Sequence, residues 1–175
     1  PGKKYDFNGQ KRVYPDIKLI YWCGGNPFHH HQDLNSLHQA WQKPDTSIVN
    51  EPWWTATAKR ADIVFPATTS YEREDLGKAM GGDQYIFHMP KLIEPVGEAK
   101  NDYFIFSELS KRLGSYQDFT EGRDDKEWVS YLYDEFKTFF KKSGIDCPGL
   151  DEVKERNWIT IPVEGKEFAP KPFQE

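Results

Sequence analysis

The chain has 175 residues, with 23 basic and 28 acidic side chains and a formal net charge of −5 at neutral pH. This length favours a single domain, and the acidic balance argues against a nucleic-acid-binding protein, which usually carries a basic excess. No apolar run reaches the roughly 18 residues that a membrane-spanning helix needs, so the sequence excludes a membrane span.

The first predicted element is a strand. Residues 1–16 are polar and show no periodicity, which favours an extended lead-in. The apolar run from Ile17 to Trp22 then stops at Gly24 and Gly25, a pattern typical of a buried parallel strand.

A helix is predicted over residues 34–41, because its apolar side chains recur at helical spacing and Asp33 or Asn35 can cap it. A second strand, a helical segment and a third strand follow, at residues 46–49, 53–60 and 62–66 respectively. This alternation predicts an α/β fold with an open, mostly parallel, Rossmann-like sheet that carries helices on both faces.

Later in the chain, alternating side chains predict a strand over residues 85–93. A helix is predicted from Asp102, its natural N-cap, to the turn that ends at Gly114. Asp124 and Glu127 indicate the start of another helix.

These elements suggest a domain organisation. The α/β domain is expected over residues 17–150, after the lead-in of residues 1–16. Residues 151–175 contain one short apolar run and a charged tail with prolines, so they are predicted to be a linker towards a further domain.

The two cysteines, Cys23 and Cys147, do not form a metal-binding pattern or a disulfide framework. Two buried thiols are the favoured interpretation, and a disulfide between them is the alternative.

The loop between the first strand and the first helix is the strongest candidate for a ligand site. In open α/β sheets, ligands bind beyond the carboxyl ends of the strands, where glycines let the backbone approach them. The loop lacks the G-x-G-x-x-G pattern, so a nicotinamide dinucleotide is not specifically indicated. Its three consecutive histidines, His29 to His31, diverge in direction and are expected to be loop residues, one of which can contact a ligand.

Further polar residues carry two interpretations each. Asn50 and Glu51 end the second strand, where dinucleotide folds place an acid that binds a ribose, although ordinary solvation fits equally well. Arg73 can hold a phosphate or pair with a neighbouring acid. Asp102 can cap its helix or accept hydrogen bonds from the N1–H and N2–H₂ edge of a guanine.

No set of nucleophile, general base and orienting residue is recognisable, which favours a nucleotide-binding domain without catalytic residues of its own.

Five motifs of the chain are linked in a fixed order: residues 21–35 (YWCGGNPFHHHQDLN), 51–58 (EPWWTATA), 61–73 (ADIVFPATTSYER), 94–102 (EPVGEAKND) and 119–122 (FTEG). Together they resemble the molybdopterin oxidoreductases, in the branch of the dimethyl sulfoxide, trimethylamine N-oxide and biotin sulfoxide reductases. They occur in the family's order along nearly the whole chain. The resemblance implies that this chain is one internal α/β domain of a larger, multidomain enzyme.

The resemblance also implies a cofactor, bis(molybdopterin guanine dinucleotide) molybdenum, one guanosine end of which this domain would hold. The expected contacts are Asn26, His30, Asn50, Glu51, Arg73 and Asp102. Related sequences often carry His-Asp where this one has Asn50-Glu51. The family's metal ligand belongs to a segment outside this chain, so neither a catalytic residue nor a metal ligand is expected here. Cys23 lies in the strand before the glycine pair, so it is not expected to be the cysteine ligand of other branches.

The implied reaction is the two-electron reduction of a small N-oxide or S-oxide. Implied partners are the remaining domains of the same enzyme and a c-type cytochrome as electron donor. The implied location is the periplasm, with the cytoplasm as the alternative. A non-catalytic nucleotide-binding or interaction module with a Rossmann-like fold is the second hypothesis, and a nicotinamide-dependent dehydrogenase is the third.

Overall fold

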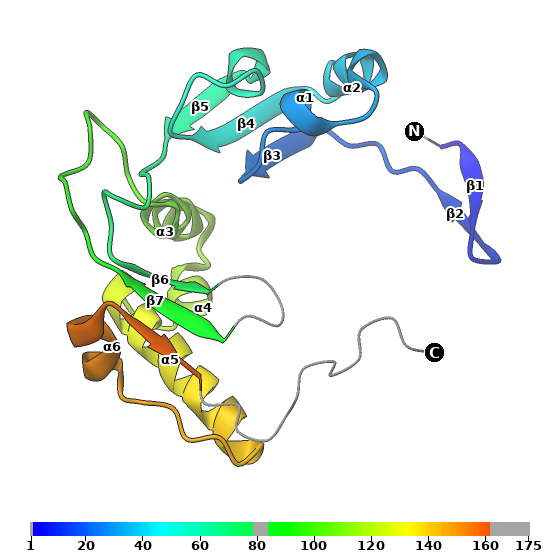
Figure 1. Ribbon diagram of the computed structural model, residues 1–175. Helices are drawn as coiled ribbons and strands as arrows, with labels where there is room; N and C mark the ends of the chain where they lie inside the picture. Colours follow the sequence, from blue (N-terminus) through cyan, green and yellow to red (C-terminus); the bar gives the residue numbers. More distant parts are fainter. Residues whose placement is uncertain (1, 79–83, 162–175) are drawn as a thin grey trace. The chain divides into compact units, whose positions relative to one another are not determined.

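The computed structural model describes residues 2–78 and 84–161 (Figure 1). It divides into two compact units: the first holds residues 1–69 and 95–105, and the second holds residues 70–94 and 106–175. The helix α3 (Asp102–Leu113) begins in the first unit and continues into the second. Across the described ranges, no helix is long and apolar enough to cross a membrane.

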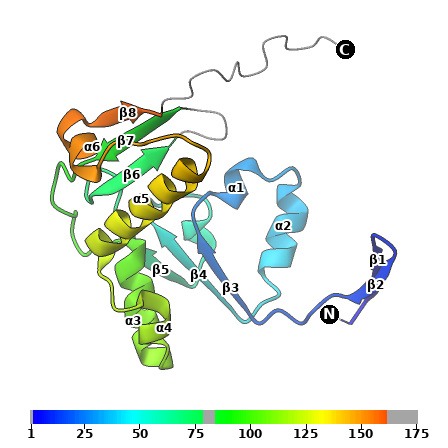
Figure 2. The ribbon, with the colours of Figure 1, turned by 90° about the horizontal axis from the view of Figure 1, so that it is seen from below.

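A parallel sheet of three strands forms the centre of the first unit. Its strands are β3 (Leu19–Cys23), β4 (Thr46–Glu51) and β5 (Ile63–Pro66), in that order across the sheet. The helices α1 (Pro27–His30) and α2 (Leu34–Trp41) connect β3 to β4. Figure 2 shows the three strands running in the same direction, so their carboxyl ends share one edge.

The core of this unit lies on one face of the sheet. Phe28, Trp41 and Val49 are buried together, with Ile20 and Trp22 packed against them. The indole of Trp41 packs against Trp22 and edge-on against Phe28, and its Nε1 donates to the Arg60 carbonyl, 3.0 Å away. The capped helix α2 therefore closes over β3 and β4, as the apolar spacing predicted, with Asp33 as the N-cap.

The predicted α/β class is confirmed, and the predicted sheet is corrected. Within residues 2–78 and 84–161, three strands are parallel and the remaining sheets are antiparallel. The apolar cluster with α1 and α2 covers the face of Ile20, Trp22 and Val49, so helices on both faces are not confirmed within the described part of this unit. The predicted mostly parallel sheet therefore holds for these three strands, and it does not extend further because the strands after β5 pair with antiparallel neighbours of their own.

The helix predicted over residues 53–60 is also corrected. Only a 3₁₀ turn, η1 (Ala58–Arg60), forms there. Thr55 Oγ1 accepts from Ala58 N at 3.2 Å, so a threonine side chain satisfies a backbone group that a longer helix would have paired.

The predicted lead-in contains a β-hairpin, β1 (Lys4–Phe7) and β2 (Gln10–Val13). Asn8 and Gly9 both have positive φ, 50° and 76°, and Asp6 Oδ1 accepts from Gly9 N at 3.0 Å. This Asn-Gly turn twists in the sense that antiparallel strands require. The Asn8-Gly9 dipeptide was the local signal for a hairpin, although the polar composition of residues 1–16 favoured an extended segment.

The second unit is built around an antiparallel sheet, in which β7 (Tyr85–Met89) lies between β6 (Asp75–Lys78) and β8 (Trp158–Thr160). The helices α4 (Tyr116–Thr120), α5 (Asp125–Lys142) and α6 (Leu150–Arg156) complete the unit. Its buried cluster joins side chains from β7, α5, α6, β8 and the adjoining loops: Ile86, Tyr133, Cys147, Val153, Ile159 and Ile161. The helix start predicted at Asp124 and Glu127 is confirmed, and these two residues form a capping box.

The segment predicted as a linker contributes to this core. The helix α6 and strand β8 lie within it, and Val153 is fully buried. A seven-residue helix with one buried apolar side chain has too little periodicity to be recognised in a sequence. The rest of the predicted linker, residues 162–175, lies outside the described residues.

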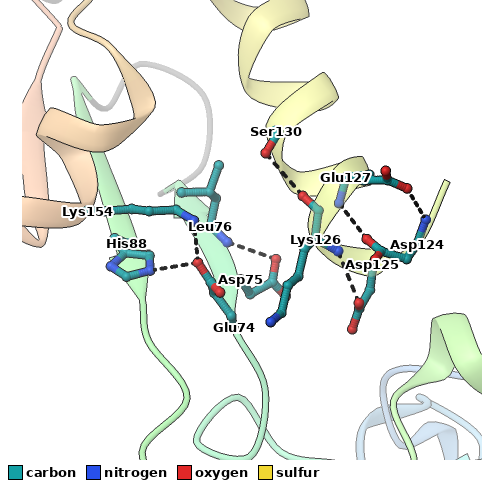
Figure 3. A network of polar contacts seen from close by, with 10 residues as sticks. All are labelled: Glu74, Asp75, Leu76, His88, Asp124, Asp125, Lys126, Glu127, Ser130 and Lys154. Atoms are coloured by element: carbon teal, nitrogen blue, oxygen red, sulfur yellow. Dashed lines mark hydrogen bonds and ion pairs between the residues drawn. The ribbon is translucent and has the colours of Figure 1, made fainter.

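A group of polar side chains joins three elements of the second unit (Figure 3). Glu74, just before β6, places Oε1 2.7 Å from Lys154 Nζ on α6 and 3.2 Å from His88 Nε2 on β7. These hydrogen bonds, first of all the one from Lys154, hold the pKa of Glu74 below its usual value although burial opposes them. His88 Nδ1 is buried and lacks a hydrogen-bond partner among the described residues.

We expect the Glu74 contacts to make the second unit sensitive to acid. The pKa of Glu74 is lower in the folded than in the unfolded state, where it is about 4.3, so the stabilisation is complete above that pH and is lost as the pH falls through the folded-state pKa. Glu74→Gln should lower the opening free energy of β7 amides by about 1–2 kcal/mol at pH 7, and by much less at low pH. Hydrogen exchange of the full-length protein measures both values.

Glu155→Gln is the matched control, because Glu155 is an exposed residue of α6 for which the described structure contains no ion pair. It should leave the exchange of β7 unchanged. An equal loss for Glu74→Gln at both pH values would contradict an electrostatic role.

Candidate functional site

The loop after β3 is held by a buried hydroxyl. Gly24 and Gly25 have φ of +77° and +72°, a conformation that other residues adopt only with strain. The next residue, Asn26, precedes α1, and its Oδ1 accepts a hydrogen bond from Thr57 Oγ1. Thr57 is fully buried, and Phe28 N donates to the same hydroxyl at 3.4 Å. The segment after β4 thus fixes the loop after β3.

The three histidines of this loop do not converge. The expectation that all three are loop residues is wrong for His29 and His30, which belong to α1 and are exposed. His31 follows the helix, and its Nδ1 accepts from Asp33 N at 3.2 Å. Residues 2–78 and 84–161 contain no cluster of three or more His, Cys, Asp or Glu side chains that could hold a metal ion. A Cβ built on Gly25 would lie 3.7 Å from His30 Nε2, so this ring faces the glycine pair and is the histidine best placed beside the loop.

Asn50 and Asp102 are brought together at the carboxyl edge of the sheet. Asn50 is 4% exposed, and its Nδ2 donates to Asp102 Oδ1 at 2.8 Å. Tyr21 of the neighbouring strand donates its hydroxyl to Asn50 Oδ1 at 3.0 Å. Because the phenol occupies the carbonyl end of the Asn50 amide, its NH₂ group must face Asp102. Tyr21 and Asn50, which are far from Asp102 in the chain, therefore orient its carboxylate.

The predicted capping role of Asp102 is wrong. Asn101 Oδ1 accepts from Phe104 N at 2.7 Å, so Asn101 caps α3, and Asp102 is its first helical residue. The extended backbone continues as far as Lys100, whose N donates to the Pro66 carbonyl and whose carbonyl accepts from Thr68 N, both at 3.0 Å. The turn into the helix consequently falls at Asn101. Asp102 is exposed, and its Oδ2 has no partner among the described residues.

Glu51 follows Asn50 as the last residue of β4. Its side chain is half-buried, and Oε2 accepts from Thr55 Oγ1 at 3.3 Å. The Glu51 carboxylate is thus held by a residue four positions later, in the turn that follows β4.

Arg73 belongs to the second unit. Its Nε lies 3.2 Å from Asp75 Oδ2, with both side chains about one-third exposed. The ion pair with a neighbouring acid that its sequence surroundings suggested is therefore present. The other five predicted site residues, Asn26, His30, Asn50, Glu51 and Asp102, all belong to the first unit.

Cys23 and Cys147 are both free thiols. Cys147 is buried as predicted, whereas Cys23 is exposed, because it lies at the end of β3 where the sheet opens towards the loop. Partial desolvation, together with the negative charge of Asp102, raises the pKa of the Cys23 thiol. Cys23 is therefore a neutral thiol near neutral pH, which disfavours it as a thiolate ligand.

The edge of the first unit presents oxygen acceptors next to an open glycine loop. The carboxylates of Asp102 and Glu51 match groups that donate hydrogen bonds, such as ribose hydroxyls or the N1–H and N2–H₂ groups of guanine. The sequence motifs included Tyr21 and Thr57 without indicating their roles. The alternation of β3 could have placed Tyr21 beside Asn50, but nothing local connects Thr57 to Asn26.

A scan against protein-family models matches residues 3–112 to the family described as "Molybdopterin oxidoreductase". A trimethylamine-N-oxide reductase of Haemophilus influenzae is 49% identical over 98% of this chain and 21% of its own length. A biotin sulfoxide reductase of Cereibacter sphaeroides is 48% identical over 85% of this chain and 22% of its own. A dimethyl sulfoxide/trimethylamine N-oxide reductase of Rhodobacter capsulatus is 44% identical over 97% of this chain and 21% of its own.

This chain therefore spans about a fifth of the length of these relatives. Among solved structures, acetylene hydratase from Pelobacter acetylenicus matches with a TM-score of 0.64 and 20% sequence identity, covering 83% of this chain and 18% of its own. That likeness concerns the fold alone.

Proposed function

The chain belongs to the molybdopterin oxidoreductase family, and from this premise we propose that it binds the guanosine end of one dinucleotide of a bis(molybdopterin guanine dinucleotide) molybdenum cofactor. The proposed contacts are Asn26, His30, Asn50, Glu51, Arg73 and Asp102. When bound, the cofactor supplies two-electron redox chemistry, and the relatives' names indicate an N-oxide or S-oxide as the substrate of the longer protein.

The orientation of Asp102 is the observation that carries this proposal. A guanine edge offers two donors, N1–H and N2–H₂, and a carboxylate accepts both in parallel. Asn50 Nδ2 occupies one side of Oδ1 only, and Oδ2 has no partner within the described residues. The acceptor oxygens of the site therefore fit the two donors of a guanine.

The position of the site in the fold gives independent support. Dinucleotides bind beyond the carboxyl ends of parallel strands, with an acid at the end of the second strand on the ribose. Glu51 ends the second parallel strand of the unit, and β3, β4 and β5 follow one another across the sheet. We also propose that these strands are the nucleotide-binding half of a Rossmann-like sheet.

Composition analysis of the full-length protein tests this function. Molybdenum measured by mass spectrometry, and GMP released by acid hydrolysis, should be present at two guanine nucleotides per metal atom. Turnover of trimethylamine N-oxide, dimethyl sulfoxide and biotin sulfoxide with a chemical reductant then identifies the oxide. Protein that binds a nucleotide but holds no molybdenum would instead support a non-catalytic nucleotide-binding module.

The electron donor and the cellular location are proposed from the family alone. A c-type cytochrome in the periplasm is the expected donor, and the remaining segments of the same polypeptide are the expected protein neighbours. Cell fractionation together with reduction by purified cytochrome checks both.

A further inference from the structure

Two consecutive tryptophans are solvent-exposed at the carboxyl edge of the first unit's sheet. Trp53 is 66% and Trp54 is 72% exposed, whereas Trp41 of the same unit is 7% exposed. They follow Glu51 by two and three positions, so they lie directly after the strand end that carries the proposed ribose-binding acid.

Hydrogen bonds order the turn that bears these indoles. Thr55 N donates to the Trp53 carbonyl at 2.8 Å, and Thr55 Oγ1 is bonded to Glu51 Oε2 at 3.3 Å and to Ala58 N at 3.2 Å. The backbone of the turn is thus tied to Glu51 on one side and to the 3₁₀ turn on the other. Both indoles are therefore presented from an ordered backbone.

The exposure of these side chains is costly. An indole buries about 150–250 Å² when it is covered, and apolar area removed from water contributes about 25 cal/mol per Å². Single exposed apolar residues are common on protein surfaces, but two adjacent large aromatic side chains beside a site are typical of a contact surface.

A purine base is the partner that this position fits. An acid in the place of Glu51 binds ribose hydroxyls, and the base is attached to the same sugar, so it must lie close to the residues that follow the acid. Stacking of a base on an aromatic side chain contributes about 1–3 kcal/mol. We propose that the Trp53–Trp54 pair is the stacking surface for the guanine base whose N1–H and N2–H₂ edge faces Asp102. This inference rests on the proposed function.

Binding of GMP to full-length protein made without the cofactor tests the proposal. Trp53→Leu or Trp54→Leu should weaken binding about 5- to 150-fold, as stacking of 1–3 kcal/mol predicts. Both variants are needed, because a single base stacks on one indole at a time. Trp158→Leu is the matched control, since Trp158 is 51% exposed but belongs to β8 of the second unit, and its affinity should not change.

A second readout covers variants that fail to fold. Trp53→Phe and Trp54→Phe keep an aromatic face, so they should retain GMP binding while one of them loses the quenching of tryptophan fluorescence by the base. Unchanged GMP affinity in both leucine variants and in their double variant, together with a loss in Asp102→Asn, would overturn stacking and leave the proposed function intact. Wild-type protein that neither binds GMP nor contains guanine would overturn the function and the stacking together.

Discussion

Replacing Asp102 with asparagine is expected to weaken the affinity of the full-length, cofactor-free protein for GMP by roughly 30- to 160-fold. Tyr21 holds the Asn50 amide so that its NH₂ faces position 102. The new amide must then turn its oxygen to Asn50 and its own NH₂ to the guanine donors. The lost charge-assisted hydrogen bonds are worth about 2–3 kcal/mol, which gives that range.

The nucleotide series makes this prediction specific. IMP lacks the N2 amino group, so wild-type protein should prefer GMP over IMP, and Asp102→Asn should abolish the preference. Asp118→Asn is the matched control, because Asp118 also lies in the first turn of a helix, α4, and is exposed. Cofactor-loaded Asp102→Asn protein should also release less GMP per chain. An unchanged GMP preference in Asp102→Asn would contradict guanine recognition by this carboxylate.

Replacing Trp41 with alanine is expected to destabilise the first unit by about 3–5 kcal/mol. Trp41 joins α2 to β3 and α1 through ring contacts with Trp22 and Phe28, and its Nε1 donates to the Arg60 carbonyl. Alanine would leave a cavity and an unpaired carbonyl in the same place. A loss of this size is a large part of the 5–15 kcal/mol by which most domains are stable.

Hydrogen exchange of the β3 and β4 amides in the full-length protein measures this loss, because it reports the unit that contains Trp41. Trp41→Phe retains most of the buried ring and should cost less than half as much. Exchange of the β7 amides, in the second unit, serves as the internal control. If Trp41→Ala left β3 and β4 as protected as in the wild type, this cluster would not be the core of the unit.

Elements with a strong local signal were predictable. The strands β3, β4 and β5 each contain short runs of apolar residues that end near a glycine or proline, and the helices at Asp33 and Asp124 begin at clear caps. The hairpin at Asn8-Gly9 had a turn signal as well. Its strands are largely exposed, so they lack the alternation of apolar and polar residues by which a strand is recognised.

Elements that depend on distant partners were not predictable. The strand β6 (Asp75–Lys78) contains a single large apolar residue, Leu76, and forms because β7 supplies its hydrogen bonds. The helix α6 buries essentially one residue, Val153, in a cluster drawn from four other segments. Neither element carries enough apolar periodicity of its own to stand out in the sequence.

The sequence by itself determined the family, the three parallel strands and the identity of the polar residues at their carboxyl ends, because each of these depends on residue types at short spacing. Only the tertiary structure decided which groups those residues contact. Asn50 and Asp102 are 52 positions apart, and the pairing of Lys100 with Pro66 and Thr68 moves the helix cap to Asn101. Asp102 is released from capping because a long-range backbone contact, which no local pattern encodes, sets where its helix begins.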